Sequence, residues 1–111
     1  MPSLPSLIIG PPSIFLDTLQ AMKLSESDRT AFLEEHFGWQ LENEMIRQTF
    51  VFADFTAAVG FVVRVGFLAE AADHHPDIDI RWNKVTLELT THSEGALTEK
   101  DTALAAAIDD L

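Results

Sequence analysis

Three of the four histidines stand close together in the second half of the sequence. His74 and His75 are adjacent, between Asp73 and Pro76, and His92 follows soon after them. An imidazole can donate and accept a proton near neutral pH, which is what general acid–base catalysis requires. A single histidine in such a place is usually a cap or a surface residue, but a cluster of three has few structural uses. We therefore predict acid–base chemistry here.

Metal binding is the alternative use of such a cluster. Two or three histidines with a carboxylate could hold zinc. Glu70 lies one helical turn before His74, roughly on the same side if the helix continues. Adjacent histidines, however, point in different directions on most backbones, and the sequence has neither a His-Glu-x-x-His helix nor a His-x-His pair. We therefore rank proton chemistry above a metal site and predict no metal ligands.

The segment between these histidines predicts a β-hairpin. Apolar and polar residues alternate after Pro76 and again before Thr90, which is the period of strands with one buried face. A tight turn is expected at residues 82–84. Because the outer ends of two antiparallel strands joined by a tight turn lie side by side, the three histidines should meet there. The apolar face is predicted to hold Ile78, Ile80, Trp82, Val85, Leu87 and Leu89.

The stretch from residue 55 to about residue 72 predicts a long helix. Asp54 is its expected N-cap, and the helix has almost no polar face. A helix that is apolar all round is buried on all sides, yet a domain of this size can cover only one side of it. We therefore predict a homo-oligomer with this helix at an interface.

Another helix is predicted from Ser25. Ser25 and the acidic residues after it form a start that is similar to a capping box. Its apolar residues Phe32, Leu33 and Phe37 are expected to face inward. Gly38 is expected to end the helix, because glycine adopts the left-handed conformation that follows a helix.

The remaining elements complete an α+β pattern. Two short strands are expected at residues 39–41 and 45–52, around a turn. Thr98 should cap the last helix, with Asp101 as a carboxylate of its first turn. The order α-β-β-α-β-β-α predicts an α+β fold, in which a four-stranded antiparallel sheet has helices packed on one face.

Composition limits the partners that the protein can have. The formal net charge is -11 with only seven Lys and Arg residues, so direct binding to nucleic acid is not expected. The chain has no cysteine, which excludes disulfides and thiolate chemistry. The apolar runs are interrupted by Arg64, and the first residues lack the basic region of a signal peptide. We expect no membrane attachment and a cytoplasmic protein.

The spacing of the polar residues resembles a known family. The series Glu70-x3-His74-His75-Pro76-x5-Trp82-x9-His92-x8-Asp101 is similar to the signature of pterin-4a-carbinolamine dehydratases, with every position filled. The stretches DHHPDI, NKV and LTTHSEGALTEKD are similar to the family as well. The resemblance covers residues 24–111, which we take as one domain. Residues 1–23, with a short helix expected from Ser13, form an N-terminal extension of unknown role.

The resemblance implies a reaction. Members of this family are hydro-lyases that remove water from 4a-hydroxytetrahydropterin to give quinonoid dihydropterin. The step recycles tetrahydrobiopterin after aromatic amino-acid hydroxylation. Loss of the hydroxyl group needs a proton donor, and formation of the C=N bond needs removal of the N5 proton. Neither step needs a metal or another cofactor, so none is expected.

The resemblance also implies roles for single residues. His74 and His92 would share the acid and base roles, and His75 would orient the pterin. Glu70 would assist proton transfer or hold a ring nitrogen. The expected substrate contacts are the backbone of Thr90 and Thr91 and, more weakly, Trp39, and the expected shaping residues are Pro76, Trp82 and Asp101.

The family's assembly agrees with the predicted interface helix. The resemblance implies homodimers that extend the sheet across subunits and pair into homotetramers through a helix bundle. An alternative is a non-catalytic interaction module, because relatives act as a transcriptional coactivator or as assembly chaperones. A protein partner beside catalysis is therefore an open expectation. The three intact histidines favour the enzyme, since a pure binding module has no need for all of them.

Overall fold

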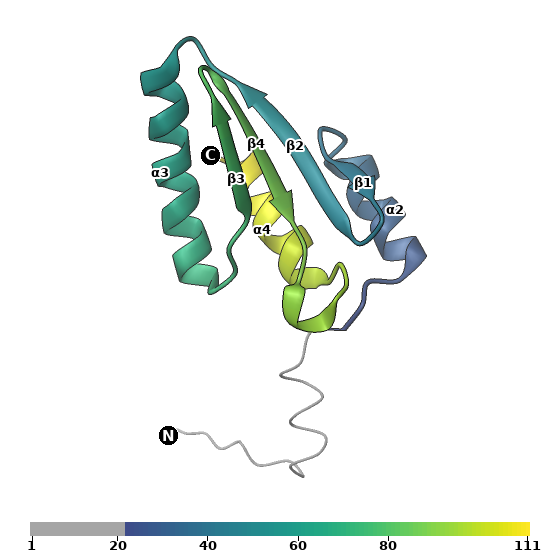
Figure 1. Cartoon of the computed structure of the whole chain (residues 1–111). Coiled ribbons are helices and arrows are strands. Elements are labelled where there is room, and N and C mark those ends of the chain that lie inside the picture. Colours follow the sequence, from purple (N-terminus) through teal and green to yellow (C-terminus); the bar gives the residue numbers. More distant parts are fainter. Residues whose placement is uncertain (1–21) are drawn as a thin grey trace, which may run out of the picture.

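The computed structural model describes residues 22–111, which form an antiparallel sheet with helices over it (Figure 1). The predicted helix from Ser13, and most of the predicted N-terminal extension, lie outside the described residues. The order of elements confirms the predicted α-β-β-α-β-β-α arrangement. The elements are α2 (Glu26–Glu35), β1 (Gln40–Glu42), β2 (Met45–Val51), α3 (Phe55–Ala72), β3 (Asp77–Arg81), β4 (Lys84–Leu89), the 3-10 turn η2 (His92–Glu94) and α4 (Glu99–Asp109).

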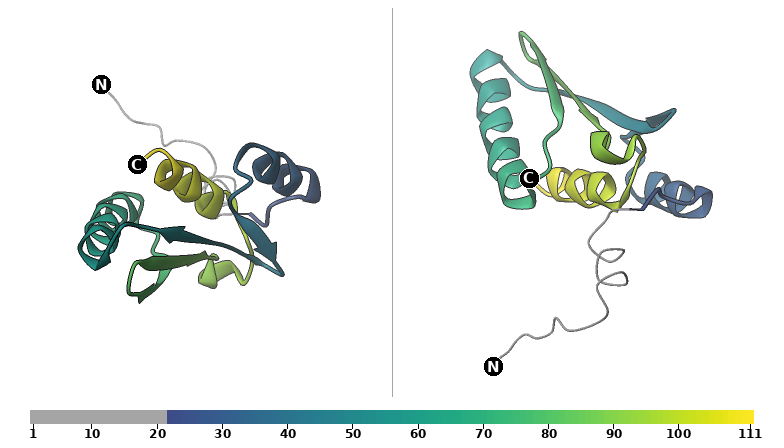
Figure 2. Two further views of the ribbon diagram at one scale, coloured as in Figure 1. Left: turned by 90° about the horizontal axis from the view of Figure 1, so that it is seen from above. Right: turned by 60° about the horizontal axis from the view of Figure 1, so that its bottom comes forward.

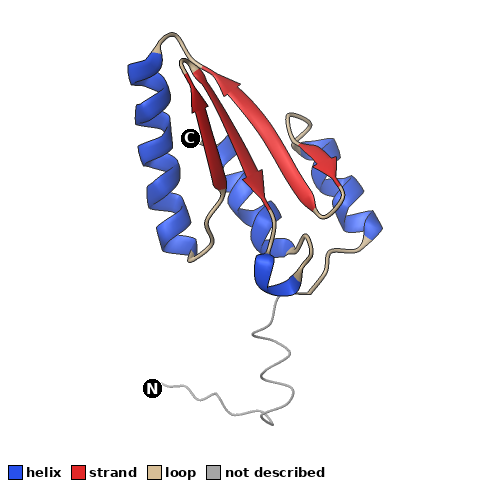
Figure 3. Ribbon diagram, in the orientation of Figure 1, coloured by secondary structure: helices blue, strands red, loops and turns tan. Residues whose placement is uncertain are grey.

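The four strands lie in the order β1-β2-β4-β3, and every neighbouring pair is antiparallel. β3 and β4 form the predicted hairpin, in which Arg81 lies opposite Lys84 beside the turn. The helices α2, α3 and α4 lie on one side of the sheet (Figures 2 and 3). The predicted α+β fold is therefore confirmed.

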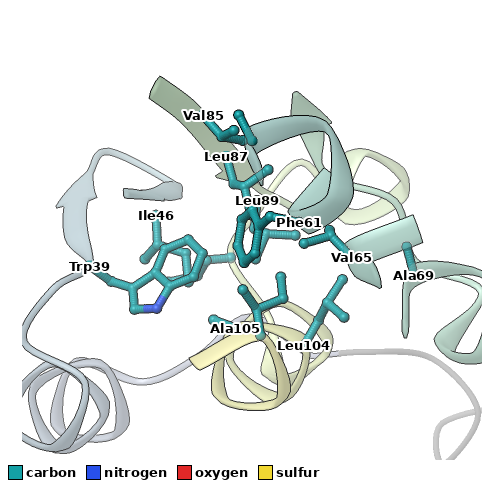
Figure 4. Packing of buried hydrophobic residues seen from close by; sticks show 13 residues of the cluster. Trp39, Ile46, Phe61, Val65, Ala69, Val85, Leu87, Leu89, Leu104 and Ala105 are labelled. Carbon is teal, nitrogen blue, oxygen red and sulfur yellow. The ribbon is translucent and has the colours of Figure 1, made fainter. Parts of the chain in front are cut away.

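An apolar cluster fills the space between the sheet and the helices (Figure 4). The ring of Phe61, on α3, lies 4.8 Å from the rings of Phe50 and Phe52, measured between centroids. Alternate residues of β4 face the same cluster, as the period of a half-buried strand requires. Other buried members are Trp39, Ile46, Val65, Val85, Leu87, Leu89, Leu97, Leu104 and Ile108.

Helix α3 has one face in this cluster and another in solvent. Its buried residues Ala58, Phe61, Val65 and Ala69 follow a spacing of three or four, which places them along one side. By length and composition alone, α3 could also span a membrane, although its buried side packs in the core. The helix thus covers the sheet, and a single chain leaves its outer side open.

The C-terminal end of α3 directs the two histidines. Asp73 adopts a left-handed conformation with φ 50 and ψ 43. Its amide donates to the carbonyl of Glu70 at 3.2 Å, and the amide of His74 donates to the carbonyl of Ala69 at 3.1 Å. This pair of bonds is a Schellman-type ending, which stops the helix and turns the chain. The helix therefore does not continue through His74, and the condition for placing Glu70 beside His74 is not met.

The N-cap of α3 leads to a first testable prediction. Asp54 Oδ1 accepts a hydrogen bond from the amide of Ala57 at 2.8 Å. Asp54→Ala removes this bond, so we expect the free energy of unfolding to fall by about 1 kcal/mol. Urea denaturation followed by circular dichroism measures the change. Glu34→Ala, at an exposed position of α2, is the control, and an equal loss in both variants would contradict the cap as the cause.

Two aromatic residues lie where the sequence did not place them. Phe37 is 86% exposed, because α2 ends at Glu35 with His36 as its C-cap, before the expected terminator Gly38. Trp82 is 66% exposed, because β3 ends before it and Trp82 occupies the turn with φ 54. The predictions that Phe37 faces inward and that Trp82 lies on the apolar face are wrong. In both cases the regular element ends one or two residues before its apolar pattern does.

Candidate active site

The carboxylate of Asp101 is the polar centre of the histidine region. Asp101 is fully buried, and its Oδ1 lies 2.5 Å from Nε2 of His74, whose side chain is 11% exposed. Its other oxygen, Oδ2, accepts hydrogen bonds from Oγ1 of Thr91 at 2.8 Å and from the amide of Thr98 at 2.9 Å. Burial of a carboxylate is costly unless it is hydrogen-bonded, and these three contacts satisfy both oxygens.

Helix α4 places this carboxylate. Thr98 is the N-cap of α4, and its side chain with that of Asp101 forms the capping box that the sequence predicts. The hydroxyls of Thr91 and Thr98 lie 2.7 Å apart and extend the network away from Asp101. The capping box by itself explains why an acidic residue stands at position 101. It does not indicate that the other carboxylate oxygen of Asp101 contacts His74. The sequence therefore did not reveal that Asp101 is the partner of a histidine.

His92 projects from the loop that joins β4 to α4. It is the first residue of η2 and is exposed to solvent. The loop is closed by backbone hydrogen bonds between Thr91 and Ala96, at 3.1 and 3.4 Å. Because Thr91 bonds one oxygen of Asp101 and His74 bonds the other, the backbone next to His92 and the ring of His74 are held by the same carboxylate.

His75 has a different partner from His74. Its Nε2 lies 3.3 Å from Oε2 of Glu70, and the two side chains are 56% and 74% exposed. A contact between side chains so exposed contributes little to stability. The two adjacent histidines therefore contact different carboxylates. His74 contacts the buried Asp101, and His75 contacts the exposed Glu70.

A groove of about 410 Å³ lies beside His74, between the C-terminal part of α3 and helix α4. Its walls are mostly small apolar side chains, and His74 and Lys100 supply its polar atoms. The residues around it are Leu68, Ala71, Ala72, His74, Lys100, Ala103, Leu104 and Ala107.

The other predicted site residues are more dispersed. Trp39 is 2% exposed and belongs to the core, where its indole N–H donates to the carboxylate of Asp109 at 3.1 Å. Thr90 is half-buried and donates from its hydroxyl to the backbone carbonyl of Glu44 at 2.6 Å. Pro76 is half-buried between α3 and β3, while Trp82 lies in the turn of the hairpin, at the other end of β3 from His74 and His75. Among residues 22–111, no three His, Asp or Glu side chains are arranged to hold a metal ion.

The chain is similar to known proteins over all of the residues that the structure describes. A sequence model of the family described as "Pterin 4 alpha carbinolamine dehydratase" matches residues 22–111. A protein of Chloroflexus aurantiacus, provisionally named pterin-4-alpha-carbinolamine dehydratase, is 58% identical over 89 residues, which are 80% of this chain and 96% of that protein. A protein of Sulfolobus acidocaldarius with the same provisional name is 46% identical over 88 residues, or 79% of this chain and 97% of the relative.

Solved structures agree with these relatives. A transcriptional coactivator/pterin dehydratase from Brucella melitensis superimposes with a TM-score of 0.76 and 36% identity, covering 80% of this chain and 97% of that chain. A pterin dehydratase-like protein identified as a RuBisCO assembly factor in the alpha-carboxysome gives a TM-score of 0.53 and 25% identity, covering 65% and 83%. With the family match and these identities, the chain belongs to the pterin-4a-carbinolamine dehydratase family.

Proposed function

We propose that the protein is a hydro-lyase that removes water from 4a-hydroxytetrahydropterin to give quinonoid dihydropterin. The observation that carries the proposal is the buried carboxylate of Asp101, which contacts His74 and also Thr91, next to His92. Membership of the family and the provisional names of the relatives support the same reaction. The recycling of tetrahydrobiopterin in the cytoplasm is the setting that the family resemblance suggests.

The chemistry needs two proton transfers, one at each side of the bond that forms. The 4a-hydroxyl group takes a proton and leaves as water, and N5 gives up its proton as the C=N double bond forms. Two imidazoles can carry both steps, one as acid and one as base, and exchange roles when the reaction reverses. No electrons are gained or lost overall, because the elements of water are removed without oxidation.

In this proposal His74 is the base. Its Nε2 donates to Asp101, which leaves Nδ1 as the nitrogen that can accept the N5 proton. The buried carboxylate stabilises the imidazolium ion that then forms, in the way that the aspartate of a catalytic triad supports its histidine. His92, which is exposed, would supply the proton to the leaving hydroxyl group.

The remaining predicted residues take supporting roles in the proposal. His75, beside Glu70, would hold the pterin from the solvent side. The backbone of Thr90 and Thr91 would bond its pyrimidine edge. Trp39, which is buried, would support the site from the core.

We also propose that α3 packs against a second copy of the chain. Four apolar residues of its outer side recur every four positions and form one ridge along the helix. They are Phe55, Val59, Val63 and Phe67, with exposed fractions of 54%, 36%, 53% and 75%. A continuous exposed apolar ridge of this kind marks an interface, and i±4 ridges are the ones that helices interlock when they pack. A homodimer or homotetramer follows from this packing.

A non-catalytic interaction module is the second proposal. One relative of the same fold is identified as a RuBisCO assembly factor, and another is described as a transcriptional coactivator/pterin dehydratase. The exposed ridge of α3 could equally serve a different protein. Catalysis separates the two proposals, because a binding module has no need for the contact between His74 and Asp101.

A stopped-flow absorbance assay tests the enzyme. The substrate is 4a-hydroxytetrahydropterin generated in the mixing chamber, and we expect its dehydration to be faster with the protein than in buffer. The rate should rise in proportion to protein concentration. A rate equal to that of buffer, with a protein whose circular dichroism shows it to be folded, would reject the enzyme and leave the interaction module.

A further inference from the structure

Glu44 contacts both ends of the loop that carries His92. It lies in the turn between β1 and β2, outside the proposed site. Its backbone carbonyl accepts a hydrogen bond from Oγ1 of Thr90 at 2.6 Å, where the loop begins. Its side-chain Oε1 accepts one from the amide of Leu97 at 3.0 Å, where the loop ends. A single residue therefore anchors the segment from Thr90 to Leu97.

Arg29 fixes the side chain of Glu44. The guanidinium group donates from Nη2 to Oε1 at 2.7 Å and from Nη1 to Oε2 at 3.2 Å, a bidentate pair. The Arg29 side chain is only 9% exposed, and its Nε donates to the carbonyl of Leu24 at 3.0 Å. Arg29 is also the buried residue of α2, so this helix is attached to the domain partly through a charged group. Lys23, 3.5 Å from Oε2, adds a weaker and more exposed contact.

The contacts of Glu44 favour its ionised form. The hydrogen bond from Arg29, followed by the one from the amide of Leu97, lowers the pKa of Glu44 to about 2. At neutral pH the residue is thus a carboxylate that several fixed donors hold. A loop that lacks such fixed hydrogen bonds can shift, because few contacts within the loop hold its backbone in place.

The anchored loop connects two parts of the proposed site. Between its ends lie Thr91, which bonds Asp101, and the exposed His92. Asp101 in turn holds His74. The position of His92 relative to His74 therefore depends on where the loop leaves β4 and enters α4, and Glu44 holds both points.

We propose that Glu44, held by Arg29, is a positioning residue that sets His92 in the geometry needed for dehydration. It acts through the loop and does not touch the substrate. The inference rests on the proposed function and assigns to it a residue outside the histidine cluster. Charge-assisted bidentate pairs give geometric specificity as well as energy, and misplacement of a catalytic group by about 1 Å can lower the rate roughly a hundredfold.

Glu44→Gln is the central variant, with Glu88→Gln as its matched control. Both substitutions replace a carboxylate that pairs with an arginine, and the two side chains are 34% and 33% exposed. Glu88 lies on β4, two residues before the loop begins, and its carboxylate pairs with Arg47 of β2. We expect Glu44→Gln to lower kcat roughly tenfold to a hundredfold with a smaller change in KM, and Glu88→Gln to leave both nearly unchanged.

Substitutions of the partner separate positioning from general stability. Arg29→Gln should lower kcat as Glu44→Gln does, and the double variant should be no worse than either alone, because both remove one interaction. Arg29→Lys keeps the charge but not the bidentate geometry, so it should recover part of the loss. All rates are measured well below the unfolding temperature of each variant. A residue with a purely structural role would lower that temperature without changing kcat.

Hydrogen exchange supplies a readout that does not depend on activity. We expect the amides from His92 to Leu97 to exchange faster in Glu44→Gln than in the wild type and in Glu88→Gln. The ionised Glu44 should stabilise the fold above its ordinary pKa of 4.5, and this stabilisation should disappear as the pH falls from there towards about 2. The difference in free energy of unfolding between wild type and Glu44→Gln should therefore shrink over the same pH range.

The two proposals fail in different ways. If the wild type lacks dehydratase activity, the proposed function is lost, and exchange of the loop amides alone decides whether Glu44 positions the loop. If the wild type is active, a kcat of Glu44→Gln within about twofold of that of Glu88→Gln overturns the positioning role. Unchanged loop exchange in Glu44→Gln overturns it in either case.

Discussion

His74→Ala is expected to lower kcat for pterin dehydration by roughly 10²- to 10⁴-fold, the range that general acid–base catalysis supplies. The reason is local, since His74 is the histidine whose ring contacts a fully buried carboxylate. Removal of the ring takes away the proposed proton acceptor and leaves Asp101 without one of its three hydrogen-bonding partners. Stopped-flow absorbance at saturating substrate measures the change.

Asp101→Asn should produce a comparable loss, although its side chain contacts no substrate in the proposal. An amide in place of the carboxylate no longer stabilises the imidazolium ion and can favour the wrong tautomer of His74. If the two residues act as a unit, the double variant His74→Ala, Asp101→Asn should be about as slow as His74→Ala alone. Multiplied losses in the double variant would show that the two act independently.

His36→Ala is the control for both variants. His36 lies at the end of α2, and its ring contacts not Asp101 but Asp109, which also accepts a hydrogen bond from Trp39. Its substitution tests whether the loss of any imidazole slows the reaction. Equal rates for His36→Ala and His74→Ala would contradict the assignment of His74, and circular dichroism of each variant verifies that it is folded.

Val63→Asp is expected to convert the protein from an oligomer into a monomer. Val63 is 53% exposed and lies in the middle of the apolar ridge of α3. In a symmetric interface each substitution occurs at least twice, and an unpaired buried charge is strongly destabilising. We therefore expect the dissociation constant of the assembly to rise at least roughly a hundredfold.

Light scattering after size-exclusion chromatography measures this change against the chain mass of 12.3 kDa. Arg64→Asp is the matched control, because it introduces the same residue one position along the helix, outside the ridge. We expect it to keep the assembly of the wild type. A wild-type protein that is monomeric at micromolar concentration, or equal dissociation in both variants, would reject the ridge as the interface.

The sequence by itself determined the elements and their order. Asp54 and Thr98 cap helices as predicted, and the alternation around β3 and β4 predicted the hairpin. Of its expected apolar face, Val85, Leu87 and Leu89 on β4 are buried, whereas Ile78 on β3 is 41% exposed. These features could be predicted because capping and periodicity depend on residues close together in the chain. The ends of α2 and β3 were predicted one or two residues too late. Phe37 and Trp82 were misplaced because an apolar residue can continue a sequence pattern after the regular backbone has ended.

The spacing of the histidines also pointed to the family, which the comparisons then established. What the sequence did not reveal was how the polar residues pair. Glu70 lies next to His75, and His74 instead contacts Asp101, because Asp73 turns the backbone at the end of α3. The left-handed conformation of a single residue at the end of a helix cannot be recognised from residue spacing.

Only the tertiary structure decided which distant groups share a contact. The pairs His74 with Asp101 and Glu44 with Leu97 join segments far apart in sequence, and each partner also has a sufficient local explanation. Asp101 fits a capping box, and Glu44 fits a polar turn. Such contacts form because the packing of α2, α3 and α4 on one sheet brings the carboxylates of Asp101 and Glu44 to the donors that satisfy them. Local patterns do not reveal that packing, so the three histidines could be selected from the sequence as candidates and the contacts around Asp101 and Glu44 could not.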